Sequence, residues 1–374
     1  MQHKTRAKIN MKRNIITVFL LICFKIGFSQ SDNYKQMRLF NKLWKKIDNH
    51  YASFEIKGIN WQDSYELFKP KISKELTQEQ LMDTLALMLK QFNDGHVGVA
   101  KIKPFPLRFT MGFAAERESY FYKEFYNDSL IQALFQTANS TLVGYGFDSL
   151  QPGYNNNKNI LDFTKSTDIG YIHMSHMEGI SARKTRILMK QILQECTGFK
   201  GIIIDVRDNK GGLPKVGDQI AGAFLDEKKH VSNDYKRKRK NHNSFSKPKP
   251  YYCKPISKNP FIGTIVILTN DRTRSAGDNF VMSLMDLPNV TIIGDRTEGI
   301  LGEAKIGFLP YGWIYGINNY KILTPDGINY EDIGIPPDIF IQNKLSDIEQ
   351  NKDPLIDKAI EVIYNQQNTS HYTQ

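Results

Sequence analysis

Residues 263–278 read Gly263-Thr-Ile-Val-Ile-Leu-Thr-Asn-Asp-Arg-Thr-Arg-Ser275-Ala-Gly-Asp278, and they carry the clearest structural pattern in the chain. The run rich in Ile, Val and Leu is typical of a strand buried on both faces of a sheet. A helical pattern starts at Ala276, which places Ser275 at a helix N-terminus, where free N–H groups favour negative charge. Such a place suits a nucleophile whose attack generates an oxyanion, although most serines there only cap the helix.

Buried strands and helices alternate on both sides of this stretch. Continuous apolar strands separated by helices predict a sheet that helices cover on both faces. We therefore predict an α/β (α+β) fold. The other expected strands are 169–174, 201–206 and 290–294, and the expected helices are 182–196, 214–225, 276–285 and 353–365.

A helical region precedes the α/β pattern. Apolar residues recur at helical spacing within residues 33–51. A second helix is predicted over 77–93, because Thr77 and Gln80 have the spacing of a capping box. Gly95 is well placed to terminate that helix.

These patterns divide the chain into successive segments. We expect an N-terminal helical domain over 31–103 and a variable linker or insert over 104–168, with a strand at 106–111. The α/β core is predicted over 169–345, and a C-terminal helix and tail over 346–374.

A second polar loop follows a predicted strand, in the stretch Ile204-Asp-Val-Arg-Asp-Asn-Lys-Gly211-Gly212. Ligands of open α/β sheets collect at the carboxyl ends of the strands. The two glycines allow backbone N–H groups to turn outward as a second oxyanion donor beside the Ala276 N–H. The alternative is a tight turn in which Asp205 and Arg207 form a structural ion pair.

Of the eight histidines, His96 has the most suggestive surroundings. It follows Asn93-Asp94-Gly95 just beyond a predicted helix, so it could project into a cleft between domains. A lone histidine is more often structural. His173 and His176 lie three apart in a strand pattern, and thus on opposite faces, so we predict no metal site.

Composition and charge exclude several classes of protein. The chain has 374 residues, three cysteines and a net charge of +11, so it is neither a disulfide scaffold nor a zinc finger. The positive charge is concentrated in the first thirty residues and in residues 228–258, which contain eleven Lys or Arg residues and one acidic residue. A nucleic-acid partner is not expected, because no basic fold surface is indicated. The 228–258 segment is predicted to be a solvated loop that contacts anionic membrane surfaces weakly.

Residues 1–30 have the pattern of an export signal. Basic residues precede the apolar run 15–24, which is too short to span a membrane permanently. Met11 is an alternative start, and Cys23 stands in a weak lipoprotein-like box. We therefore expect export to the periplasm, the cell envelope or the medium. Whether Cys196 and Cys253 pair stays open.

The order of the motifs resembles the tail-specific (C-terminal-processing) serine peptidase family, which includes the tricorn core and the interphotoreceptor retinoid-binding modules. The matching stretches are Asp94-Gly-His96, 204–212, Ser275-Ala-Gly-Asp, 294–299 and 331–338. The resemblance implies a crotonase-like core and serine endopeptidase activity. It also implies that Ser275 is the nucleophile, and that Ala276 and Gly211 or Gly212 form the oxyanion hole.

Two departures from the family pattern indicate which branch of the family this sequence resembles. Ile300 occupies the position of the lysine base used by tail-specific enzymes. The tricorn-like branch uses an upstream histidine instead, which corresponds to His96, and supports it through a Ser and a Glu. Here Gly95 replaces that Ser, while the Glu corresponds to Glu331, with Glu303 as the alternative acid. Segment 104–168 lacks the motifs of a PDZ domain.

The sequence therefore predicts an exported serine endopeptidase that acts on peptides or unfolded proteins through an acyl-enzyme, without a cofactor. The alternative is a catalytically weak or inactive protein of the same fold that binds a hydrophobic ligand or peptide. The oligomeric state and the cleavage preference are not indicated.

Overall fold

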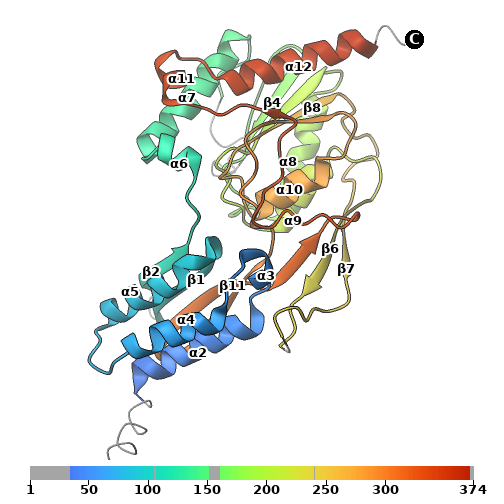
Figure 1. Ribbon diagram of the computed structural model, residues 1–374. Helices are drawn as coiled ribbons and strands as arrows, with labels where there is room; N and C mark the ends of the chain where they lie inside the picture. The colour runs from blue at the N-terminus through green and yellow to red at the C-terminus, as the bar shows by residue number, and fades with distance from the viewer. Residues whose placement is uncertain (1–33, 105–106, 151–160, 240, 371–374) are drawn as a thin grey trace, which may run out of the picture.

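The computed structural model describes residues 34–370 apart from 105–106, 151–160 and 240 (Figure 1). The predicted export signal and the predicted polar loop near residue 155 lie outside the described residues. Within the described part, no helix is both long and apolar enough to cross a membrane.

A six-stranded sheet forms the centre of the larger part of the molecule. Its strand order is β13-β9-β8-β5-β4-β3, and all neighbours are parallel except the antiparallel pair of β3 and β4. The apolar runs of the sequence become its inner strands, so the α/β prediction is confirmed. The strands are β3 (Asp162–Lys165), β4 (Ile169–His173), β5 (Gly201–Asp205), β8 (Thr264–Thr269), β9 (Val290–Gly294) and β13 (Ile339–Phe340).

Helices cover both faces of this sheet, as Figure 1 shows. Helices α8 (Ala182–Glu195), α9 (Pro214–Ala221) and α10 (Ala276–Leu284) pack on the face that carries Ile202 and Ile267. The other face packs against α7 (Asp128–Gly144) and α12 (Pro354–Ser370). Each fully buried Ile or Leu contributes about 1.5–3 kcal/mol, so burial on both faces fixes the positions of the strand ends.

The N-terminal helices pack on a second sheet. Helices α2 (Lys35–His50) and α5 (Gln78–Leu89) cover one face of the strand order β10-β11-β1-β2. The short helices between and after them are α3 (Phe54–Lys57), α4 (Trp61–Phe68), η1 (Lys69–Lys71) and η2 (Lys90–Phe92), and the strands are β1 (Asp94–Pro104), β2 (Leu107–Ala115), β10 (Ala304–Leu309) and β11 (Trp313–Asn318).

This sheet corrects the prediction of a purely helical domain over 31–103. The capping box at Thr77 is present, but the 3-10 turn after α5 ends at Asn93, which has a left-handed φ of 44°, and not at Gly95. Residues from Asp94 onward form β1, and its partner β11 comes from far along the chain. Local periodicity could not indicate that pairing.

Residues 228–258 form a hairpin, and not the solvated loop predicted. Strands β6 (Lys229–Lys236) and β7 (Lys249–Cys253) pair with each other, and β12 (Tyr320–Leu323) completes a three-stranded sheet. The hairpin is anchored because Val231 and Cys253 are buried and the Tyr251 hydroxyl donates to Asp218. Both Cys196 and Cys253 are free thiols.

Segment 104–168 links the two larger parts of the molecule. It supplies β2 to the second sheet, crosses upward before α6 (Tyr120–Glu124), and continues through α7 to β3 at the edge of the core sheet (Figure 1). The segment therefore belongs structurally to both parts, because its helix and its strand pack into the core. The helix α11 (Leu345–Glu349) and the 3-10 turn η4 (Pro310–Gly312) complete the described elements.

Candidate active site

Ser275 lies in a sharp turn between β8 and α10. Its φ of 57° and ψ of −114° lie outside the ordinary regions for a residue with a side chain. Such strain is held only where the surroundings over-determine it, and it projects the side chain out of the strand–helix connection. Gly211 packs directly against this turn, since a Cβ on it would lie 2.8 Å from the Ser275 Cβ. The half-buried Ser275 hydroxyl is therefore presented beside the 204–212 loop.

His96 reaches Ser275 from the second sheet. Its Nε2 lies 3.2 Å from the Ser275 Oγ, although 179 residues separate the two in sequence. His96 follows the end of η2 by four residues, and it is the third residue of β1, a strand that the sequence did not indicate. Its backbone N–H donates to the Asp94 carboxylate, which in turn accepts from the Tyr51 hydroxyl at 3.0 Å. The strand and these bonds fix where the imidazole points.

The surroundings of His96 favour its neutral form. Burial lowers the pKa of the imidazole, the positive charge of Arg274 lowers it further, and the negative charge of Asp94 opposes both effects. The Nδ1 atom is buried and has no hydrogen-bond partner among the described residues. A neutral ring with its proton on Nδ1 leaves Nε2 free to accept the proton of Ser275.

Two backbone N–H groups beside Ser275 are available to stabilise an oxyanion. Those of Gly212 and Ala276 donate to no acceptor within the described part of the chain. The Gly211 N–H donates to the Asn209 side chain at 2.9 Å, so of the two predicted glycines only Gly212 has a free donor. Gly212 has a φ of 137° and bridges in parallel to Met177, and the preceding Gly211 packs against the Ser275 turn.

Asp278 holds the nucleophile turn together, and the sequence analysis assigned it no role. Its carboxylate accepts from the backbone N–H groups of Ser275 at 2.6 Å, Gly299 at 3.0 Å and Ile300 at 3.3 Å. Burial raises the pKa of Asp278 to about 6, against these hydrogen bonds, which lower it. The capping-box spacing of Ser275 and Asp278 was the available indication in the sequence.

The two predicted acids lie in different surroundings, and no hydrogen bond joins either one to the His96 ring in the described structure. Glu331 is buried, accepting from the Leu301 N–H at 3.0 Å and from Asn318 at 3.1 Å. Burial and the neighbouring Asp94 charge raise the pKa of Glu331 to about 8. Glu303 is exposed. Glu331 is therefore the acid that belongs to the buried surroundings of the site.

An ion network borders the site, and the sequence analysis missed it. Arg272 lies 3.2 Å from the buried Glu298 carboxylate, and Arg274 lies 3.2 Å from Glu116. Burial raises the pKa of Glu298 to about 7, against the lowering effect of both arginines. Ile300, at the position of a lysine in the resembling enzymes, is buried, and its Cδ1 lies 3.5 Å from where a Gly95 Cβ would stand.

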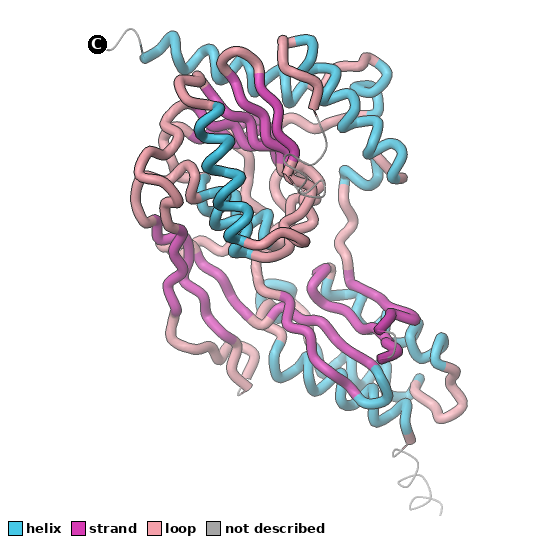
Figure 2. The backbone as a smooth tube through the Cα atoms, turned by 180° about the vertical axis from the view of Figure 1, so that it is seen from behind, coloured by secondary structure: helices cyan, strands magenta, loops and turns pink. Residues whose placement is uncertain are grey.

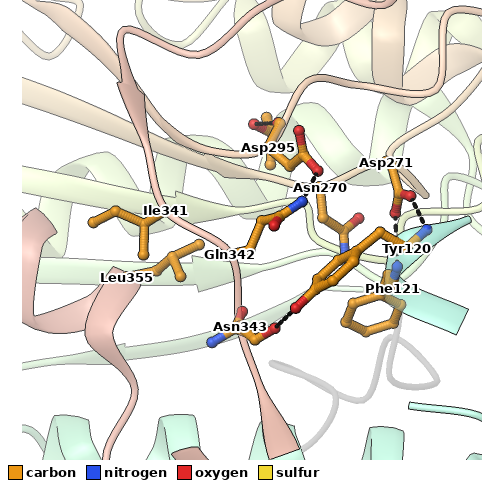
Figure 3. Close-up of a pocket in the computed structure, with 10 residues that line it drawn as sticks. Tyr120, Phe121, Asn270, Asp271, Asp295, Ile341, Gln342, Asn343 and Leu355 are labelled. Atoms are coloured by element: carbon orange, nitrogen blue, oxygen red, sulfur yellow. Dashed lines mark hydrogen bonds between the residues drawn. The ribbon is translucent and has the colours of Figure 1, made fainter. Parts of the chain in front are cut away.

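A narrow crevice elsewhere at the strand ends is separate from this cluster (Figure 3). Its lining includes Tyr120, Asp271 and Asp295 but neither Ser275 nor His96. The Asp271 carboxylate accepts from the Tyr120 backbone N–H, and the Gln342 side chain donates to Asp295. The bond between Tyr120 and Asp271 fastens the start of α6 to the loop that leads into Ser275.

The remaining histidines of interest do not form a metal site. His173 lies in β4 against Asp162, while His176 follows the strand and contacts Ser175. No cluster of three or more His, Cys, Asp or Glu side chains suited to a metal occurs among the described residues.

Comparisons with known proteins agree with this geometry. Residues 168–341 match the model of peptidase family S41, and residues 32–90 match the tricorn protease C1 domain. A tricorn protease homolog from Saccharolobus solfataricus is 29% identical over 210 residues, which are 53% of this chain and 17% of that relative. Carboxyl-terminal-processing peptidase 1, chloroplastic, from Arabidopsis thaliana is 27% identical, over 46% of this chain and 33% of that relative.

A solved structure extends the likeness to most of the chain. A candidate peptidase from Parabacteroides merdae is 25% identical, with a TM-score of 0.71 over 88% of this chain and 97% of that one. By contrast, the chain spans only 17% and 33% of the two curated relatives named above. The mixed α/β fold is thus shared over nearly the full length of a solved relative.

Proposed function

Because residues 168–341 belong to peptidase family S41, we propose that the chain is a serine endopeptidase that cleaves peptide bonds through an acyl-enzyme on Ser275. The observation that carries the proposal is the 3.2 Å contact between His96 Nε2 and Ser275 Oγ. Two distant segments meet there, at a strained turn that a mere helix cap does not need.

In the acylation step, the Ser275 Oγ attacks the carbonyl carbon of the scissile peptide while His96 Nε2 takes the hydroxyl proton. The C–N bond then breaks, and the same proton passes from His96 to the leaving amine. Water attacks the resulting ester with His96 again as base, which releases the second product and restores Ser275. The lowered pKa of His96 keeps the base neutral near pH 7.

The oxyanion of each tetrahedral intermediate lies, in this proposal, between the N–H groups of Gly212 and Ala276. Both donors are preorganised: Ala276 begins α10, and Gly212 is held by its bridge to Met177. Losing one such donor costs about 2.7–4 kcal/mol of transition-state stabilisation. Asn209 assists indirectly, because it orients the loop through the Gly211 N–H.

A carboxylate is expected to stabilise the imidazolium that forms during the reaction. The negative charge of Asp94 raises the His96 pKa, which makes it the electrostatic support for that charge. Glu331 is mostly protonated at neutral pH, since its pKa is raised to about 8. We therefore assign Glu331 to the hydrogen-bonded support of Leu301 and Asn318, and not to direct contact with the ring.

The second candidate function is a binding protein that has lost efficient catalysis. The specific observation in its favour is the buried Nδ1 of His96, which lacks a partner among the described residues. Covalent labelling by a serine-directed probe separates the two functions, because a binding protein has no activated hydroxyl.

We also propose export and contact with anionic surfaces. Support for export comes from the basic, then apolar pattern of residues 1–30. Support for contact with anionic surfaces comes from Lys238, Arg239 and Lys247 of the β6–β7 hairpin, which are exposed. Salt-dependent binding to anionic vesicles that disappears when these three are replaced by Gln supports the contact, and binding that persists contradicts it.

The activity is tested with an unfolded protein such as reduced, carboxymethylated lactalbumin. Wild type is expected to produce fragments over time, while folded Ser275→Ala protein produces none. If neither protein cleaves any of several unfolded substrates, and no serine-directed probe reacts, the peptidase proposal is wrong.

A further inference from the structure

The second sheet has one face that helices cover and one that they leave open. Figure 2 shows the strands of this sheet with the N-terminal helices behind them. On the covered face, Val97, Val99 and Trp313 are buried in the core with α2 and α5. On the open face, Phe308 is 78% exposed and Ile306 is 68% exposed.

The strand register places the open-face residues in rows across the four strands. None of these residues is charged. The row nearer Ser275 is Ile306, Gly316, Gly98 and Ala114, and the next row is Phe308, Ile314, Ala100 and Gly112. The two inner positions of the first row are both Gly, and those of the second row are Ile and Ala. A bulge on β2 then brings Phe109, itself 71% exposed, opposite Ile102.

This open face leads directly to the candidate base. Val97 and Val99 point into the core, so Gly98 and Ala100 face the open side. His96 lies two residues before Gly98, within the register shift between Asp94 and Gly98, and its Nε2 reaches Ser275. Gly98 is two residues from His96, so their Cα atoms are at most about 7 Å apart. From His96 to Ile102 the chain spans at most about 20 Å, which is the length of roughly six extended residues.

Large exposed apolar surfaces on soluble proteins mark binding sites. We propose that this face binds large apolar side chains of an extended polypeptide substrate whose scissile bond lies at Ser275. The inference rests on the proposed peptidase function and adds its substrate class: segments rich in Leu, Ile, Val and Phe, as exposed by unfolded proteins.

The shape of the face favours a substrate chain over a second copy of the protein. Gly98, Ala100 and Gly316 form a floor without bulk, and the exposed Ile306 and Phe308 stand along one border of it. Small residues in the middle of the sheet leave room for the side chains of an extended substrate strand that lies on it. Its continuity with His96 directs such a strand to the nucleophile.

The test compares three fluorogenic peptides that share one cleavage core. A long peptide carries Leu and Phe four to six residues from the core, its matched partner carries Ser and Gln there, and the third is the core alone. Wild type is expected to cleave the apolar peptide about tenfold or more better in kcat/KM, mainly through KM, because burial of one or two large side chains is worth that factor.

The double variant Ile306→Asp/Phe308→Asp is expected to lose this preference. Both positions are exposed, so folding should persist, and the rate of fluorophosphonate labelling at Ser275 should equal that of wild type. Ile262→Asp is the matched control, since Ile262 is 85% exposed and lies outside the sheet. It should keep the full preference.

Three results overturn the inference, and they are distinguishable. If wild type cleaves without preferring the apolar peptide, or the double variant keeps the preference, the face does not bind substrate. If sedimentation shows a wild-type dimer that the double variant dissociates while the preference survives, the face is an interface between copies. If wild type is neither labelled nor active, the proposed function itself fails and this inference with it.

Discussion

His96 Nε2 lies 3.2 Å from Ser275 Oγ, although His96 is in β1 of the second sheet and Ser275 is in the turn that follows β8 of the core sheet. The contact therefore depends on how the N-terminal part docks on the core. Near the site, the buried Glu331 accepts from Ser53 of the N-terminal part and from Asn318 of the second sheet, and Lys57 pairs with Asp332. Changes to this framework should affect catalysis without any contact to substrate.

In a plot of kcat/KM against pH, the fall in activity on the acidic side should have its midpoint below pH 6.5. The base must be neutral, and burial followed by the Arg274 charge lowers the His96 pKa from its ordinary 6.5. Replacing Arg274 by Gln removes a charge that disfavours the imidazolium, so the midpoint should move to higher pH. The measurement is kcat/KM against pH, with Arg296→Gln as control. A wild-type midpoint at or above 6.5, or no shift in Arg274→Gln, contradicts this account.

Asn209→Ala should reduce kcat much more than it changes KM. The Asn209 side chain accepts from the Gly211 N–H at 2.9 Å and donates to the Met174 carbonyl at 2.7 Å. Without it the Gly212 donor is misplaced, and kcat should fall by about 10²–10³, as when one oxyanion donor is lost. Asn289→Ala is the control, because Asn289 makes a similar bond to the Gly263 carbonyl away from the site. Equal kcat in both folded variants would refute the role.

Glu331→Gln should alter how stability depends on pH. The raised pKa of about 8 means that Glu331 remains protonated in the folded protein while it ionises near 4.5 when unfolded. Its contribution to stability is thus complete below pH 4.5 and is lost as the pH rises to about 8, with a slope of up to about 1.4 kcal/mol per pH unit. Urea unfolding between pH 5 and 8 should show that decline in wild type and less of it in the variant. Parallel declines would show that Glu331 ionises normally.

Asp353→Ala should strongly destabilise the fold. Asp353 is buried and lies 2.7 Å from Arg207, which also pairs with Asp205. Removing one partner from such a buried cluster typically costs about 3–5 kcal/mol. In the helix that follows Asp353, Glu361→Ala removes a surface pair with Lys358 and should cost less than about 1 kcal/mol. A loss below 1 kcal/mol for Asp353→Ala in urea unfolding would contradict the assigned role of the cluster.

Local patterns in the sequence were sufficient for the core. Apolar runs such as 264–269 are strands, and Thr77 begins a helix with the expected capping box. Ser275 was placed correctly at the start of a helix, because an apolar strand pattern precedes it and a helical pattern of apolar residues follows it. These features depend on neighbours within a few residues, which a single sequence displays.

Features that depend on distant partners were not predictable in this way. β1 was missed because its pairing with β11 is set by residues far along the chain. The hairpin of β6 and β7 was hidden because basic residues, such as the exposed Lys236 and Lys249, dominate its sequence, while the residues that anchor it are the few buried ones such as Val231 and Cys253. The role of Asp278 emerges only when Gly299 and Ile300 are folded back onto the nucleophile turn.

Covalent labelling reports directly whether His96 activates Ser275. The protein is incubated with a fluorophosphonate probe, digested, and analysed by mass spectrometry to locate the modified residue. The account predicts one label, on Ser275, in folded wild type, none after urea denaturation, none in Ser275→Ala, and labelling slowed by about 10² or more in folded His96→Ala. A label on another residue, or undiminished labelling of Ser275 without the imidazole, would contradict it.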